Sequence, residues 1–158
     1  MNVQMFLKDH GVPFEPLVHA PAYDAQRMAQ VLHVPGREVA KTVLLRTESG
    51  GEYFVAVLPA TRHVDLKKAA VVLGSSPLEL ASEFELSQHV RDCELGTLPP
   101  FGSQYGMQTV LERSLTDDET VVFEGNSHHE SIRMKLADYC QLERPLVASF
   151  AYEAAEVG

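Results

Sequence analysis

The stretch from Val39 to Leu66, VAKTVLLRTESGGEYFVAVLPATRHVDL, constrains the fold more than any other part of the chain. It holds two apolar runs, at 42–46 and 53–59, separated by the sequence Glu-Ser-Gly-Gly. Such runs predict strands, and paired glycines supply the positive φ that a tight turn needs. The pattern therefore predicts a β-hairpin. Lys41 directly precedes the first apolar run, where its ammonium either reaches solvent or is held in a cleft at the end of the sheet.

Helix and strand patterns mix around this hairpin without the regular βαβ alternation of a parallel sheet. Apolar residues at helical spacing predict helices, and alternating or continuous apolar runs predict strands. The predicted helices are 2–10, 25–32, 66–73, 76–82, 83–90 and 137–142, and the predicted extended segments are 13–19, 42–46, 53–59, 107–112, 120–123, 131–136 and 146–150. We therefore predict an α+β protein with a curved, mixed or antiparallel, barrel-like sheet flanked by helices.

The length of 158 residues suits one domain, 1–158, in which the tail 151–158 is expected to be frayed. No apolar run approaches the roughly 20 residues that span a bilayer, and the first ten residues lack a signal-peptide layout. We expect a cytoplasmic protein without a membrane partner. Cys93 and Cys140 are isolated, which indicates neither a zinc site nor a disulfide framework.

The formal net charge of −9 argues against broad electrostatic binding to nucleic acid, and we expect no DNA partner. The charge is unevenly distributed. Residues 37–68 hold six Lys and Arg against four Asp and Glu, a net +2, which leaves −11 for the rest of the chain. This local excess either suits a partner that presents only a few phosphates or reflects the ordinary fluctuation of short windows.

Two features, one within this region and one beyond it, are candidates for ligand binding. Lys41 is either a solvated lysine at the end of a strand or a point charge that holds a phosphate or a carboxylate. The loop 96–102, Gly-Thr-Leu-Pro-Pro-Phe-Gly, combines glycines that let backbone approach a ligand with prolines that stiffen it. It is either a rigid turn or a set of amides that face an oxyanion or orient a water.

Two histidine-containing segments are weaker candidates. The segment 126–130, Asn-Ser-His-His-Glu, suggests a metal, but neighbouring strand residues point to opposite faces and one ion would not readily take both rings. We therefore expect no metal and no cofactor, and interpret a single histidine as a hydrogen-bond donor to substrate or as part of a surface turn. The segment 19–23, His-Ala-Pro-Ala-Tyr, either lines a pocket or forms a packed turn. The chain has no G-x-S-x-G, P-loop or H-E-x-x-H sequence.

Taken together and in order, these segments resemble the YbaK/ProX-type aminoacyl-tRNA deacylases, which are related to the editing insertion domain of bacterial prolyl-tRNA synthetase. The resemblance covers roughly residues 15–150. The segments that carry it are His19-Ala-Pro-Ala-Tyr, Val39-Ala-Lys-Thr-Val-Leu-Leu, Val57-Leu-Pro-Ala with Val64-Asp-Leu-Lys-Lys, Gly96-x-x-x-Pro100 running into Phe101-Gly102, and Ser127-His128 before Ile-Arg-Met.

The resemblance implies a trans-editing hydrolase that cleaves the ester between a wrongly attached small amino acid and the tRNA 3′ end. Lys41 would hold the terminal phosphate and His128 would be the pocket histidine. The loop would contact the aminoacyl group and place water, while the tRNA 2′-hydroxyl assists the attack. The residues that would bind substrate are Tyr23, Thr42, Gly96, Thr97, Leu98, Pro99, Pro100, Phe101, Gly102, Asn126 and Ser127. The implied partner is the acceptor end of a mischarged tRNA, and a synthetase partner is left open.

Three departures from the family pattern bear on these expectations. Thr42 follows the lysine where some alanine-specific members have Asn, and Asn126 stands where many have Gly. His129 beside His128 leaves open which ring faces the pocket. Two other functions remain as alternatives: a non-catalytic module that binds tRNA or a synthetase, and a small-molecule esterase. Turnover of mischarged tRNA separates the first from a deacylase, and activity on simple amino-acid esters identifies the second.

Overall fold

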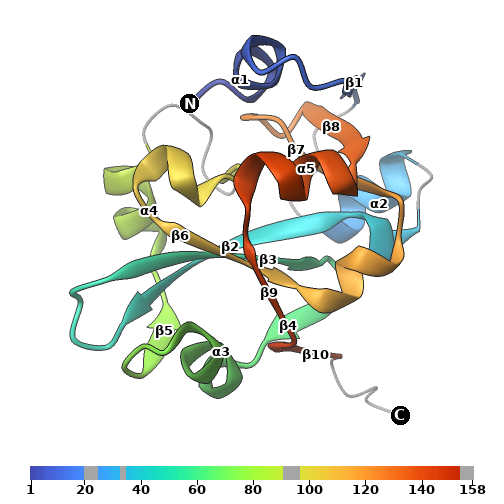
Figure 1. Ribbon diagram of the computed structural model, residues 1–158. Coiled ribbons are helices and arrows are strands. Elements are labelled where there is room, and N and C mark those ends of the chain that lie inside the picture. The colour runs from blue at the N-terminus through green and yellow to red at the C-terminus, as the bar shows by residue number, and fades with distance from the viewer. Residues whose placement is uncertain (20–24, 33–34, 91–96, 154–158) are drawn as a thin grey trace.

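The predicted hairpin forms the centre of the molecule (Figure 1). The computed structural model describes residues 1–19, 25–32, 35–90 and 97–153. Strands β2 (Ala40–Thr47) and β3 (Tyr53–Pro59) pair antiparallel. Gly50 takes the positive φ expected of the turn, at 78°. The Thr47 hydroxyl closes the turn because it accepts from the backbone N–H groups of Gly51 and Glu52, at 3.1 and 3.2 Å.

Other strands extend the hairpin into a mixed sheet of order β5-β2-β3-β6-β9. β5 pairs antiparallel with β2, whereas β6 runs parallel to both β3 and β9, so the predicted mixed sheet is confirmed. Outside the hairpin the strands are β1 (Glu15–Val18), β4 (Arg62–Val64), β5 (Leu78–Leu80), β6 (Gln108–Glu112), β7 (Thr120–Glu124), β8 (Glu130–Lys135), β9 (Leu146–Ala148) and β10 (Ala151–Glu153).

The helix predicted at 76–82 is wrong, because Leu78–Leu80 form strand β5 instead. A helix of seven residues is marginal by itself, whereas the free edge of β2 offers backbone hydrogen bonds to an extended segment. A cross-strand ion pair between Arg46 and Glu79, directly opposite each other, adds to the pairing. The edge of the hairpin therefore decides the conformation of this segment.

The sheets do not close into the barrel-like form expected from sequence. Among the described strands, β1-β8-β7 and β10-β4 form sheets of their own beside the five-stranded sheet. An isolated parallel bridge between Val39 and Val122 connects β7 to the start of β2. The tail expected to be frayed begins with β10, which pairs with β4 from Ala151 to Glu153; residues 154–158 lie outside the described residues.

Helices cover both faces of the five-stranded sheet (Figure 1). On one face, α3 packs through Ala69 against Leu45, Leu58 and Phe150. On the other face, a larger core joins α1, α5 and the three-stranded sheet, and contains Leu7, Val55, Leu111, Phe123, Ile132 and Tyr139. The helices are α1 (Val3–Asp9), α2 (Ala25–Leu32), α3 (Leu66–Leu73), α4 (Glu83–His89) and α5 (Leu136–Glu143), with 3-10 helices η1 (Gly36–Glu38), η2 (Gly102–Tyr105) and η3 (Arg113–Asp117).

The ends of the helices follow local sequence rules. Asp65 caps α3 by accepting from two backbone N–H groups at 3.1 Å, and Gly74 ends it in the left-handed conformation. Both roles agree with the helix predicted at 66–73. No helix built from the described residues has the length and apolarity needed to cross a membrane.

Candidate functional site

Lys41 lies near the start of β2, opposite Leu58 of β3. Since strand residues alternate between faces, Lys41 shares its face with Val39, which packs against Ala29 of α2. The side chain is half-buried, and burial lowers the pKa of its ammonium below the ordinary lysine value. Within the part of the chain that the structure describes, this ammonium has neither a hydrogen bond nor an ion pair. Lys41 therefore carries a partly desolvated charge that is available to an anion.

The junction of β2 with β7 brings a second group of polar side chains toward this position. The parallel bridge joins Val39 to Val122, so Lys41 and Glu124 each lie two residues further along, on the same face of their strands. Glu124 Oε2 is 3.7 Å from His128 Nδ1, and both side chains are almost fully buried. The fold thus places the lysine strand next to the strand that leads into the histidine turn.

The segment between β7 and β8 orients the two histidines differently. Gly125 N–H donates to the Glu130 carbonyl at 3.0 Å, which closes the turn, and the Ser127 hydroxyl accepts from the backbone N–H of His129 at 3.2 Å. His128 is buried, at 8% exposure, whereas His129 is exposed. His128 is therefore the ring that faces inward. In the described chain, no three His, Cys, Asp or Glu side chains gather in a way that suits a metal.

Asn126, which the sequence assigned to substrate binding, makes side-chain contacts with the N-terminal segment. Its φ of 75° is left-handed. Its side-chain oxygen accepts from Val3 N–H at 2.8 Å, and its amide nitrogen donates to the Met1 carbonyl at 2.6 Å. The amide is engaged with the N-terminal segment of the chain, so its contacts hold the turn.

The loop Thr97–Gly102 is buried along its whole described length. Leu98 and Phe101 belong to the large core, together with Ala40 of β2. By strand alternation, this core lies on the face of β2 that Thr42 shares, opposite to Lys41. The buried side chains of the loop therefore lie on the face of β2 opposite to the ammonium. Gly96 and Tyr23, which the sequence also assigned to substrate, lie outside the described residues.

Side chains from α5 and β6 hold this loop in place. The Tyr139 hydroxyl donates to the Pro100 carbonyl at 2.6 Å, and burial raises the pKa of that hydroxyl well above the ordinary value. The Thr109 hydroxyl accepts from Gly102 N–H at 2.9 Å and donates to Glu143 at 2.6 Å. The fixed φ of the two loop prolines adds to this stiffness. The rigidity predicted for the loop is therefore explained by a buried network.

Two polar residues near the histidine turn were missed or underused by sequence reasoning. Glu124 was not singled out from sequence, although its spacing of four from His128 was visible. His19 Nε2 lies 2.7 Å from the Ser131 hydroxyl, and His19 N–H donates to the His129 carbonyl at 2.9 Å. The His19 segment therefore lies directly beside the turn that carries His128. No local pattern could have indicated a pairing across more than a hundred residues.

Fold and site together define a mixed α+β domain. It presents a half-buried cation, unpaired among the described residues, on a strand that lies next to the one leading into an inward-facing histidine. Such a domain is suited to a ligand with an anionic group. The family model described as "Aminoacyl-tRNA editing domain" matches residues 19–142, and the chain belongs to this family.

Curated relatives and solved structures agree with this assignment. The chain is 22% identical over 147 residues to the multifunctional Ser/Thr-tRNA deacylase ProXp-y of Escherichia coli K12, covering 91% of this chain and 87% of the relative. It is 23% identical over 136 residues to the prolyl-tRNA editing protein ProX of Acetoanaerobium sticklandii, covering 84% and 82%.

Two solved structures share the fold over nearly the whole chain. One belongs to a hypothetical protein and matches with a TM-score of 0.87 at 19% identity, covering 96% of this chain and 100% of the other. The second is described as a candidate trans-editing enzyme for prolyl-tRNA synthetase and matches with a TM-score of 0.80 at 22% identity, covering 96% and 95%. At these identities the likeness concerns the fold alone, which confirms the predicted α+β class.

Proposed function

We propose that this chain is an aminoacyl-tRNA deacylase that removes a wrongly attached small amino acid from the 3′ end of tRNA. The observation that carries the proposal is the Lys41 ammonium, half-buried and without a carboxylate partner among the described residues. A charge left unpaired in a partly desolvated place interacts more strongly with an incoming anion than a solvated one. The phosphate of the terminal nucleotide is the anion that an editing domain would offer at this position.

The proposed reaction is ester hydrolysis. The oxygen of a water molecule attacks the aminoacyl carbonyl carbon, and the bond between that carbon and the ribose 3′-oxygen breaks. The 3′-oxygen takes a proton, and the amino acid leaves as a carboxylate. The tRNA 2′-hydroxyl assists the attack, the loop 96–102 positions the ester and the water, and His128 donates a hydrogen bond to the substrate. Positioning and backbone dipoles then supply the rate enhancement.

The choice of a small amino acid rests on two supports. The Escherichia coli relative is named a Ser/Thr-tRNA deacylase and the other relative a prolyl-tRNA editing protein. Discrimination between amino acids that differ by one methylene is limited to about 1–3 kcal/mol in a binding pocket, which is the reason that a second, hydrolytic site is useful. Serine and threonine are therefore the first amino acids to test, followed by alanine.

The proposal is tested with a panel of tRNAs mischarged with Ser, Thr, Ala or, as a large control, Phe, with and without prolyl-tRNA synthetase. We expect deacylation of at least one small amino acid and near-complete loss in Lys41→Ala. His128→Ala should be slower by about 10- to 100-fold, the cost of one hydrogen bond to substrate. Lys67→Ala, which removes an exposed charge from α3, should retain the wild-type rate.

Three outcomes would overturn the proposal. Binding of tRNA without turnover of any panel member would indicate a binding module. Equal activity on simple amino-acid esters without tRNA would indicate a small-molecule esterase. Wild-type deacylation by Lys41→Ala would remove the role assigned to the ammonium.

A further inference from the structure

The N-terminal segment is attached to the turn that carries His128. Asn126 Oδ1 accepts from Val3 N–H at 2.8 Å, and Asn126 Nδ2 donates to the Met1 carbonyl at 2.6 Å. Both contacts cross more than 120 residues of sequence. They fix the conformation of a residue whose φ of 75° is uncommon for residues other than glycine and asparagine. The side chain and the backbone of Asn126 are thus constrained by the same partner.

The same segment also contacts the loop on the other side of the site. Phe6 of α1 packs edge-on against Phe101, with ring centroids 5.3 Å apart, and Val3 and Leu7 are fully buried in the large core. The Met1 nitrogen donates to the Tyr105 hydroxyl in η2, directly after the loop, at 3.0 Å. Figure 1 shows α1 lying over the sheet that contains β7 and β8. The first residues therefore touch both segments that carry the proposed site.

The N-terminal partners in these contacts, Met1, Val3 and Phe6, lie outside the part of the chain that the family model matches, residues 19–142. We propose that Asn126 is a positioning residue, which uses the N-terminal segment to hold the 125–129 turn so that His128 faces the substrate. The inference rests on the proposed function, because it assigns Asn126 a role through His128. It replaces the substrate contact that the sequence suggested for Asn126. Glycine at this position would permit the backbone conformation but would leave the turn unattached.

Substitution of Asn126 distinguishes the need for a left-handed backbone at this position from the need for the hydrogen bonds to Met1 and Val3. Asn126→Gly keeps the left-handed conformation accessible and removes both hydrogen bonds. We expect kcat for deacylation to fall about tenfold, the equivalent of one lost interaction. KM should change less than twofold, because Lys41 still binds the phosphate. In the free protein, the His128 ring signals in NMR spectra should shift or broaden, a readout that does not depend on turnover.

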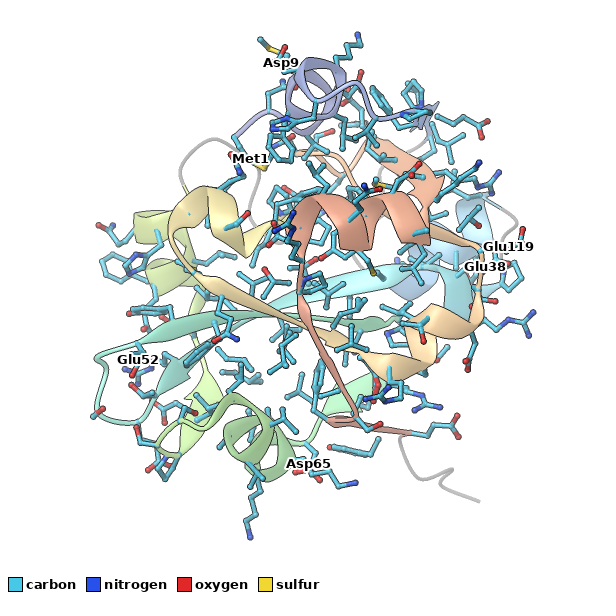
Figure 2. All side chains as sticks on the ribbon, viewed as in Figure 1. Met1, Asp9, Glu38, Glu52, Asp65 and Glu119 are labelled. Atoms are coloured by element: carbon cyan, nitrogen blue, oxygen red, sulfur yellow. The ribbon has the colours of Figure 1, made fainter. Side chains whose placement is uncertain are left out.

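Two further variants make the comparison specific. Asn126→Asp keeps the acceptor for Val3 N–H and loses the donor to Met1, so its kcat and His128 signals should lie between those of the wild type and Asn126→Gly. Asp65→Ala removes the cap of α3 at the opposite end of the molecule from Met1 (Figure 2). It should lower the unfolding midpoint without changing kcat or the His128 signals.

The outcomes are distinguishable from a failure of the proposed function, which would appear as an active Lys41→Ala variant. The positioning role is overturned if Asn126→Gly has wild-type kcat and unshifted His128 signals. It is also overturned if Asn126→Gly raises KM at unchanged kcat, because that result indicates a direct substrate contact. If Asn126→Gly does not fold, unchanged His128 signals and kcat in Asn126→Asp would contradict the proposal equally.

Discussion

Lys41 carries a charge that is unfavourable for stability because it is partly buried, yet the proposed function needs this charge. Burial of an ammonium costs free energy unless the charge is paired, and among the described residues Lys41 has no such pair. Natural proteins retain unfavourable groups of this kind where function needs them. Stability and activity should therefore respond in opposite directions to substitution at this position.

Lys41→Met should stabilise the protein while it abolishes deacylation. Methionine keeps a flexible unbranched side chain and removes the desolvated charge. We expect the free energy of unfolding to rise by about 0.5–1 kcal/mol, measured by urea denaturation at neutral pH. Lys67→Met, at an exposed position, should change it little. A clear loss of stability in Lys41→Met would mean that the ammonium is already stabilised within the folded chain.

The stability difference between the two proteins should depend on pH with a defined sign. Because burial lowers the pKa of Lys41 from the ordinary value of 10.5, the folded protein binds fewer protons than the unfolded chain between the two values. Wild-type stability then rises with pH across that interval. The advantage of Lys41→Met should be complete at neutral pH and shrink as the pH approaches 10.5. An advantage that grows at alkaline pH would contradict the assigned burial effect.

At the scale of elements, the loop Thr97–Gly102 is fixed by close packing as well as by hydrogen bonds. A Cβ on Gly102 would lie 2.6 Å from Thr109 Oγ1, 2.9 Å from Val55 Cγ2 and 3.0 Å from the Met107 carbonyl oxygen. None of these atoms is the end of a long flexible side chain. Glycine is thus required here for space rather than for backbone conformation.

Gly102→Ala should destabilise the protein by about 1–3 kcal/mol, as expected for overpacking, and lower deacylation because the loop must shift. Gly51→Ala is the matched control. A Cβ at Gly51 meets no atom within 4 Å, and its φ is not in the positive range. The control should be neutral or slightly stabilising. Equal urea midpoints for the two variants would show that the loop can accommodate a Cβ at Gly102, which would contradict the close packing.

Local patterns predicted the elements whose structure is decided locally. The hairpin β2–β3 was visible in two apolar runs and a Gly-Gly turn, and α3 in its spacing and its cap at Asp65. The segment that forms β5 was assigned to a helix because its strand conformation depends on the edge of β2, more than thirty residues away. The contacts of Asn126 and the burial of Lys41 depend in the same way on distant segments. Sequence named Lys41 and His128 as candidates, and tertiary packing determined what surrounds them.

At the scale of the whole molecule, the charge limits how tRNA can be bound. The chain carries a net charge of −9, so long-range attraction to a duplex backbone is unfavourable. The proposed site offers one half-buried cation to the phosphate of the terminal nucleotide. An acidic protein with one such contact should bind the single-stranded acceptor end and repel the rest of the tRNA.

The salt dependence of tRNA binding measures how many phosphates the protein contacts. Each phosphate contacted in a single strand contributes about −0.7 to the slope of log K against log salt concentration. One or two contacts therefore predict a slope of about −0.7 to −1.4, measured by fluorescence anisotropy with a non-hydrolysable, amide-linked aminoacyl-tRNA. Lys41→Met should make the slope shallower by about 0.7, whereas Lys67→Met should leave it unchanged. A slope steeper than about −3 would require four or more phosphate contacts. So many contacts would need an extended basic surface, which a chain of this charge would have to form from residues far from Lys41.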